Sequence, residues 1–367
     1  MNQYINPSLK VLRHADRIAE LQANRIPYPV NVEVDISNRC LLGCEWCHFG
    51  YTHSRGPLAK STNKEGLEDM GDLMSPTLFE RFAPEMSACG VQSVTFSGGG
   101  DPLTHPDFGS FLRAAKSANL KVGLYTSLRG AKEIDLSLIS IYCEWVVVSI
   151  DEPDAESYQR VKGVDAFGQI TESVKRLMLE KNTKYKGTTD CIVGASFLIN
   201  KDNVYKIHKM VKLHEELKTD YALFRPTIQY DLKNPSVMVE KHSGNWMDKL
   251  AMIMIDSKYH ERKDIEASAK KFLRYRDWDN TDRGYSECVA NLFTGCITPN
   301  GKVWVCINRR GFPGSCVGDL NLESFREVWQ KQSRHTDFDQ CRVCCRGDEL
   351  NLVLQPLLQI QKHEEFV

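Results

Sequence analysis

Ten of the chain's thirteen cysteines fall into two groups, and this distribution limits what the chain can fold into. Cys40, Cys44 and Cys47 lie together near the N-terminus, and seven more lie between Cys288 and Cys345. A disulfide framework is typical of short secreted chains, whereas an odd number of cysteines in 367 residues fits metal or redox chemistry better. We therefore expect two metal sites, one in each group.

The charge balance excludes some partners. The chain has 47 basic and 48 acidic residues, so it has no overall positive charge to attract nucleic acid or an anionic membrane. Its N-terminus is polar, and its apolar runs, such as residues 145–148, are far shorter than the roughly 20 residues that a membrane span needs. We expect a soluble, cytoplasmic protein with no membrane partner and no nucleic-acid partner.

Apolar, β-branched stretches alternate with helical stretches from residue 30 onward. Such stretches are typical of parallel strands that are buried on both faces. Six of them predict an α/β fold, a partial (β/α)6 TIM-like barrel rather than a closed barrel of eight strands. The predicted strands are residues 32–36, 93–96, 122–126, 145–150, 192–199 and 222–224, with helices such as 75–89 and 107–119 between them.

The pattern divides the chain into five parts. We expect the barrel to be followed by a charged helical connector and then by a small cysteine-rich α+β domain, in which CITPNGKVWVC predicts a hairpin that turns at residues 299–301. The predicted bounds are 1–27 for an N-terminal helical segment, 28–230 for the barrel, 231–284 for the connector, 285–347 for the cysteine-rich domain and 348–367 for a C-terminal helix.

The first cysteine group lies in the loop NRCLLGCEWCHFG, directly after the first predicted strand. Three thiolates this close can hold three corners of an iron–sulfur cube and leave the fourth iron without a protein ligand. A structural zinc site would need a fourth ligand, and His48 or His53 lies near enough in sequence to supply it. The spacing alone leaves both metals open.

This spacing, with Trp46 before the last cysteine, resembles the signature of the radical S-adenosylmethionine (SAM) superfamily. A glycine-rich loop, SGGGDP, follows the second predicted strand where that family has one, with Asp101 in place of its usual glutamate. Glycines let a backbone approach a small ligand closely. The resemblance implies a [4Fe–4S] cluster that binds SAM, held by Cys40, Cys44 and Cys47. It implies cofactor contacts from Trp46, Gly98, Gly99, Gly100 and Asp101.

Two serines at later strands match positions that contact the rest of SAM in that family. Ser149 ends the fourth predicted strand and would face the ribose, and Ser196 lies in the fifth and would flank the adenine. Each also fits an ordinary strand residue. In the family, one electron from the cluster cleaves SAM to methionine and a 5′-deoxyadenosyl radical, which removes a hydrogen atom from an unactivated carbon.

The C-terminal cysteines resemble the family's twitch or SPASM-type auxiliary domain. Cys288 is followed by Gly301, then by Cys306 after four intervening residues, and later by the pair Cys341 and Cys344. The resemblance implies that these four cysteines hold one auxiliary [4Fe–4S] cluster, because no cysteine follows Cys345. A zinc site built from the same four remains an alternative. Cys296, Cys316 and Cys345 are left over as buried packing or as hydrogen-atom donors, and Cys316 and Cys345 are the candidate donors.

These features favour a radical SAM dehydrogenase that acts on a sugar, an aminocyclitol or a similar small molecule, with the auxiliary cluster as electron acceptor. A flavodoxin or ferredoxin-type partner would supply the first electron. The alternatives are an epimerase with Cys316 or Cys345 as hydrogen donor, a peptide-modifying enzyme, and a non-catalytic zinc or iron–sulfur module. Arg225, after the sixth strand, would bind a carboxylate or phosphate of the substrate or form a structural ion pair.

Overall fold

The computed structural model describes residues 10–44, 47, 68–184, 190–200, 202–227, 262, 264–267, 283–336, 341, 345 and 347–358. Six parallel strands form the body of the fold, and each lies within two residues of its predicted bounds. They run side by side in chain order, so each strand contacts the next one along the chain. The strands are β1 (Asn31–Val34), β2 (Ser93–Phe96), β3 (Lys121–Thr126), β4 (Cys143–Ser149), β5 (Ile192–Ile199) and β6 (Tyr221–Pro226).

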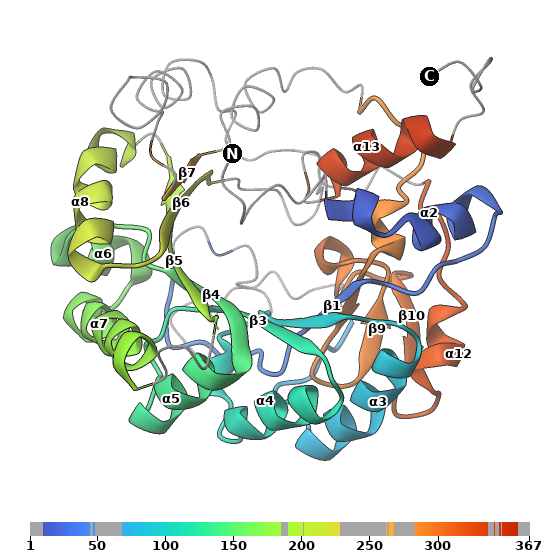
Figure 1. Ribbon diagram of the computed structural model, residues 1–367, viewed down its shortest axis with the longest axis horizontal. Helices are drawn as coiled ribbons and strands as arrows, with labels where there is room; N and C mark the ends of the chain where they lie inside the picture. The colour runs from blue at the N-terminus through green and yellow to red at the C-terminus, as the bar shows by residue number, and fades with distance from the viewer. Residues whose placement is uncertain are drawn as a thin grey trace.

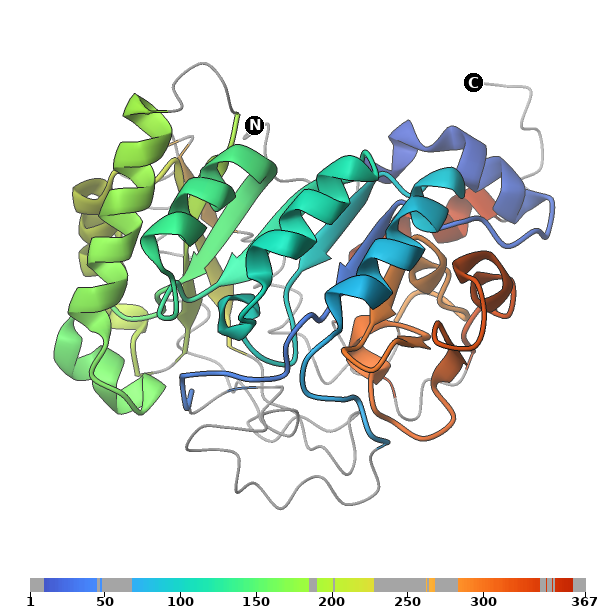
Figure 2. The same ribbon diagram turned by 90° about the horizontal axis from the view of Figure 1, so that it is seen from below.

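Helices cover the convex outer face of this curved sheet, as Figures 1 and 2 show. Their apolar sides pack on the outward-facing strand residues; on α3, Phe79 packs edge-on against Phe96 of β2. The prediction of a partial α/β barrel is therefore confirmed. The covering helices are α3 (Pro76–Ala88), α4 (Phe108–Ser117), α5 (Glu133–Tyr142), α7 (Phe167–Thr183) and α8 (Ile207–Leu217), and the shorter α6 (Ala155–Lys162) follows β4.

The described part of the predicted helical connector contains a strand. β7 (Ile265–Ala267) pairs in parallel with β6 and adds a seventh parallel strand to the barrel sheet. Three residues are too few to show the alternation of apolar and polar side chains that predicts a strand. Pairing with β6 decides the conformation of this stretch. Most of the rest of that segment lies outside the described residues.

The C-terminal segment continues the same sheet. The predicted hairpin is present: β8 (Thr294–Ile297) and β9 (Lys302–Trp304) are antiparallel, and Gly301 in the turn has a φ of 83°. β10 (Cys316–Asp319) pairs with β9. β8 also pairs in parallel with β1, so the sheet order is β10-β9-β8-β1-β2-β3-β4-β5-β6-β7. The sequence did not predict that the two cysteine groups share one sheet.

Short helices close the end of the sheet that carries β8. The predicted N-terminal helix is a 3-10 turn, η1 (Val11–Arg13), followed by α2 (Ala15–Gln22), which lies beside α13 (Asp348–Leu358), as Figure 1 shows. Leu21 and Leu354 are fully buried in their shared core. α12 (Phe325–Trp329) packs nearby, with the indole N–H of Trp329 donating to the Pro27 carbonyl at 2.7 Å. The remaining 3-10 turns are η3 (Pro102–Thr104), η4 (Val204–Lys206), η5 (Ala290–Leu292) and η6 (Ile307–Arg309). No helix in the described ranges is both long and apolar enough to cross a bilayer.

A buried ion cluster joins the C-terminal segment to β1. The Arg310 side chain, which follows η6, is fully buried and pairs with the carboxylate of Asp35, while Glu33 lies 4.0 Å away. Burial raises the pKa of Asp35 to about 6, although the positive charge of Arg310 acts to lower it. Glu33 in turn accepts a hydrogen bond from Ser97 at 2.9 Å. Removing one partner of a buried pair leaves the other charge uncompensated, so this cluster fixes how the two parts fit together.

Replacing Arg310 with methionine should therefore lower the free energy of unfolding by about 3 kcal/mol or more, because Asp35 would stay buried without its partner. The exposed pair Lys331–Glu323 in the same segment is a matched control, and Lys331→Met should cost less than about 1 kcal/mol. Urea unfolding followed by circular dichroism measures both variants. Equal losses for the two variants would contradict the structural role of Arg310.

Candidate functional site

The polar loops meet at one edge of the barrel. Because β1 to β6 are parallel, their carboxyl ends and the loops that follow lie at the same edge of the sheet. The first cysteine loop follows β1 and the glycine-rich loop follows β2. The convergence of the two motifs therefore follows from strand direction and order.

Cys40, Cys44 and Cys47 lie half-buried in the loop after β1, and none of the described cysteines forms a disulfide. The Leu42 amide donates to the Cys40 sulfur at 3.4 Å, and the Cys47 amide donates to the Cys44 carbonyl at 3.1 Å. Burial, together with the charge of Asp101, raises the pKa of Cys40 to about 12. Metal binding would displace the proton of such a thiol.

The donor set fits an iron–sulfur cluster. Three thiols, none of them in a disulfide, share one short loop, and the charge of Cys44 acts on Cys40. Among the residues that the structure describes, no three His, Cys, Asp or Glu side chains are already arranged as metal ligands. Trp46 and the alternative zinc ligands His48 and His53 lie outside the described residues.

The glycine-rich loop packs directly on the first cysteine loop. The Gly100 amide donates to the Ser37 carbonyl at 3.1 Å, and the Asp101 amide donates to the Arg39 carbonyl at 2.8 Å. A Cβ atom at Gly100 would lie 2.1 Å from the Arg39 carbonyl oxygen, which only glycine avoids. Gly98 and Gly99 precede this contact, and Gly98 has a φ of 154°. From the sequence we expected these glycines to let the backbone approach a bound ligand. At Gly100 the backbone instead lies close to the cysteine loop.

The Asp101 carboxylate is held by the end of β3. It accepts hydrogen bonds from the Thr126 hydroxyl at 2.8 Å, from the Ser127 amide at 2.8 Å and from the Ser127 hydroxyl at 2.6 Å. It also accepts one from the Leu103 amide at 3.1 Å. These bonds fix the loops after β2 and β3 relative to each other, and the predicted cofactor contact of Asp101 stays a prediction.

Ser149, Ser196 and Arg225 come together across the ends of β4, β5 and β6. Ser149 and Ser196 are register partners, and the Arg225 guanidinium donates to the Ser196 hydroxyl at 3.1 Å. The guanidinium also lies over the ring of Tyr125, 5.8 Å from its centre. The Arg225 Nε is buried without a hydrogen-bond partner in the part of the chain that the structure describes. An unsatisfied buried donor at a loop edge is suited to binding an anion or a hydroxyl.

A lysine that the sequence analysis missed lies against the first cysteine group. Lys162 ends α6 and forms a buried ion pair with Asp151, and it lies close enough to Cys44 for the charges of the two side chains to interact. Burial raises the pKa of Cys44, and the positive charge of Lys162 acts in the opposite direction. The lysine is far from Cys44 in sequence, so only the fold brings them together.

The second cysteine group gathers at the base of α13. Burial and the neighbouring Cys341 and Cys288 raise the pKa of Cys306 to about 12. The charges of Cys288 and Cys306 also act on Cys345, which therefore lies with this set. Asn351 of α13 donates to the Cys288 sulfur at 3.2 Å. Cys344, the fourth ligand expected from the sequence, lies outside the described residues.

Cys316, the other predicted hydrogen donor, lies on β10 near the end of the sheet. Its thiol donates to the Gly318 carbonyl at 3.5 Å, and it packs against the cluster of Met70, Cys296 and Trp304. Cys316 pairs with Trp304 on β9, Trp304 with Cys296 on β8, and Cys296 with Glu33 on β1. Three spacings between neighbouring strands, about 14 Å, therefore separate Cys316 from Glu33. Its role as a hydrogen donor stays a prediction.

Comparisons with known proteins agree with this site. A family model described as the radical SAM superfamily matches residues 34–213, which include both loops. A GTP 3′,8-cyclase of Chlorobaculum tepidum is 21% identical over 187 residues, which are 50% of each chain, so the chain spans about half the length of this curated relative.

Two solved proteins have a similar fold. SuiB of Streptococcus suis, in complex with precursor peptide SuiA, is 17% identical with a TM-score of 0.60, over 89% of this chain and 71% of that one. Native anSMEcpe with bound AdoMet is 14% identical with a TM-score of 0.59, over 88% of each chain. At this level of identity the likeness is one of fold. The family match over residues 34–213, which hold both loops, is the observation that places this part of the chain in the radical SAM superfamily.

Proposed function

We propose that this protein cleaves SAM reductively and uses the resulting 5′-deoxyadenosyl radical to take a hydrogen atom from its substrate. The observation that carries the proposal is the packing of the glycine-rich loop on the loop of Cys40, Cys44 and Cys47 at the carboxyl edge of the barrel. A [4Fe–4S] cluster bound there, with one iron free of protein ligands, would chelate SAM and supply the electron that breaks its sulfur–carbon bond.

The chain's own residues would bind and orient SAM. Gly98, Gly99 and Gly100 offer backbone groups beside the cysteine loop, and Asp101 holds that loop against β3. Ser149 and Ser196 lie further along the edge, where the ribose and adenine would follow. Trp46 belongs to the same set in the family pattern.

We further propose dehydrogenation of a hydroxylated small molecule, such as a sugar or an aminocyclitol. The adenosyl radical would take the hydrogen of a carbinol carbon, a base would take the hydroxyl proton, and the remaining electron would pass to the auxiliary cluster. Arg225 supports this reading, because its buried Nε can bind a hydroxyl or an anion. A flavodoxin or ferredoxin-type protein would deliver the electron that starts each turnover.

The auxiliary cluster would be held by Cys288, Cys306, Cys341 and one cysteine of the pair that follows. The proximity of Cys345 to Cys288 and Cys306 supports Cys345 as the fourth ligand in place of Cys344. Placed so, Cys345 would not serve as a hydrogen donor. The pairing of β8 with β1 keeps this group close to the barrel, as electron transfer requires.

Peptide modification is the second candidate. SuiB, whose fold is similar, was solved in complex with its precursor peptide. The structure of anSMEcpe with the Cp18Cys peptide has a TM-score of 0.54 with this chain. Among the described residues β7 is the last strand at this end of the sheet, and this end is compatible with a peptide as well as with a small molecule. Epimerisation would need a thiol such as Cys316 near the substrate carbon.

Anaerobic protein reconstituted with iron and sulfide should form 5′-deoxyadenosine from SAM when dithionite is added. The variant with Cys40, Cys44 and Cys47 all changed to alanine should form none, because it lacks the ligands of the first cluster. Liquid chromatography measures the product, and metal analysis distinguishes iron from zinc. Wild-type protein that holds iron and sulfide yet yields no 5′-deoxyadenosine would refute the proposal.

Cys345→Ala should lower the iron content by about four atoms per chain, whereas Cys344→Ala should keep it. The two residues are adjacent, so each variant is the matched control of the other. Iron analysis and electron paramagnetic resonance (EPR) of the reduced proteins report the loss directly. Loss of the auxiliary signal in Cys344→Ala alone would restore the assignment made from the sequence pattern.

Turnover in deuterium oxide distinguishes the outcomes of the substrate radical. A dehydrogenase should yield an oxidised product with no deuterium at the reacting carbon, because no hydrogen atom is returned to it. An epimerase should yield an isomer that carries one deuterium from an exchanged thiol. Mass spectrometry of products from a panel of sugars, aminocyclitols and cysteine-containing peptides makes the measurement, and modification of the peptides alone would overturn the small-molecule assignment.

A further inference from the structure

The end of α6 packs against the first cysteine loop through both backbone and side chains. The Gly43 amide donates to the Lys162 carbonyl at 2.8 Å, and a Cβ atom at Gly163 would lie 3.3 Å from the Gly43 carbonyl oxygen. Gly163 has a φ of 69°, the left-handed conformation that ends many helices. The helix end is thus fixed beside Cys44, the residue that follows Gly43.

Two side chains of α6 turn their polar ends toward Cys44. The Lys162 side chain is 3% exposed, pairs with Asp151 and lies close enough for its charge to interact with Cys44. Tyr158 lies one turn earlier on the same face of the helix and close enough for its charge to interact with Cys44. Its hydroxyl is fully buried, and it finds no hydrogen-bond partner within the described ranges. An unsatisfied hydroxyl beside a cluster ligand points to an acceptor that arrives with the cluster.

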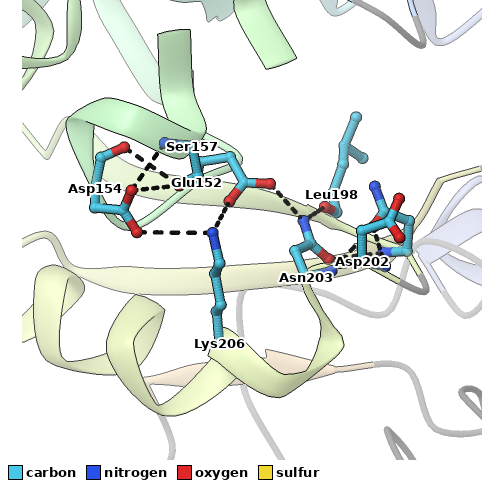
Figure 3. Close-up of polar contacts among 8 residues, drawn as sticks. Glu152, Asp154, Ser157, Leu198, Asp202, Asn203 and Lys206 are labelled. Atoms are coloured by element: carbon cyan, nitrogen blue, oxygen red, sulfur yellow. Dashed lines mark hydrogen bonds and ion pairs between the residues drawn. The ribbon is translucent and has the colours of Figure 1, made fainter. Parts of the chain in front are cut away.

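Asp151 holds the lysine in place. It has a φ of 68°, unusual for a residue other than glycine, and its second carboxylate oxygen accepts the Leu198 amide at 3.0 Å. The neighbouring network of Glu152 with Lys206 and Asn203, shown in Figure 3, is separate from the cysteines. The chain therefore carries two lysine–carboxylate pairs after β4, of which one contacts a cysteine of the first group.

We propose that Lys162 and Tyr158 set the reduction potential of the SAM-binding cluster by donating hydrogen bonds to the Cys44 thiolate. This proposal rests on the proposed function, since it concerns the cluster that Cys44 would hold. One-electron reduction adds a negative charge to the cluster, and a buried ammonium group beside one ligand stabilises the reduced form. Hydrogen bonds to the sulfurs and net local charge are established determinants of such potentials. The pair is therefore positioned to make the cluster easier for the electron donor to reduce.

The test is an EPR-monitored redox titration of reconstituted full-length protein without SAM. The signal that changes on later addition of SAM identifies the first cluster. Lys162→Met should lower the ratio of reduced to oxidised cluster at a given potential about tenfold, which is a shift of about 59 mV to more negative potential. Tyr158→Phe should shift it in the same direction by less, and Lys162→Arg should retain the wild-type value.

Lys206→Met is the matched control, because Lys206 pairs with Glu152 and Asp154 on the same loop. It should leave the potential unchanged. If Lys162→Met fails to hold iron, Asp151→Asn replaces it: asparagine tolerates the left-handed backbone, and losing the opposing charge should shift the potential to a more positive value. A Lys162→Met shift no larger than that of Lys206→Met, or no positive shift in Asp151→Asn, overturns the proposal. Failure of the proposed function would appear instead in wild-type protein, as the absence of a SAM-sensitive signal.

Discussion

The hydrogen bonding of β1 on both of its edges is the constraint on which the rest of the structure depends. β2 occupies one edge and β8 the other, both in parallel register with residues 31–34. The first pairing aligns the cysteine loop with the glycine-rich loop, and the second brings the C-terminal cysteines to the same sheet. A strand in this position must form its backbone hydrogen bonds on both edges and bury its side chains on both faces. On one face the buried side chains are Val32 and Val34.

The other face of β1 is charged, and this is what joins the two parts specifically. Glu33 and Asp35 point to the side that receives Arg310, and Cys296 of β8 lies fully buried beside them. Ser97 extends the contact to the loop that follows β2. Buried charges of this kind cost free energy unless their partners are in place. The same contacts therefore connect the folding of the C-terminal segment to the shape of the glycine-rich loop.

At each cysteine group, one helix supplies the polar side chains that lie beside the thiols. α6 brings Lys162 and Tyr158 to Cys44, and α13 brings Asn351 to Cys288. A backbone hydrogen bond holds α6 to the loop that it supports, and α13 is held by its Asn351 side chain, which accepts from the Val289 and Ala290 amides. Thiols that are buried and hydrogen-bonded in this way are prepared for deprotonation by a metal, since the donors remain to stabilise the thiolates.

The sequence by itself determined the two motif loops and most of the strands. Three cysteines at fixed spacing after one strand, and SGGGDP after the next, indicate where a cluster and SAM would bind, because both signals are local. Tertiary structure alone decided the contacts between distant residues: Lys162 at Cys44, Arg310 at Asp35, Asp101 at Ser127 and β8 beside β1. Those contacts depend on strand order and register, which a pattern of apolar residues does not specify. In the same way, residues 265–267 form the strand β7 because they pair with β6.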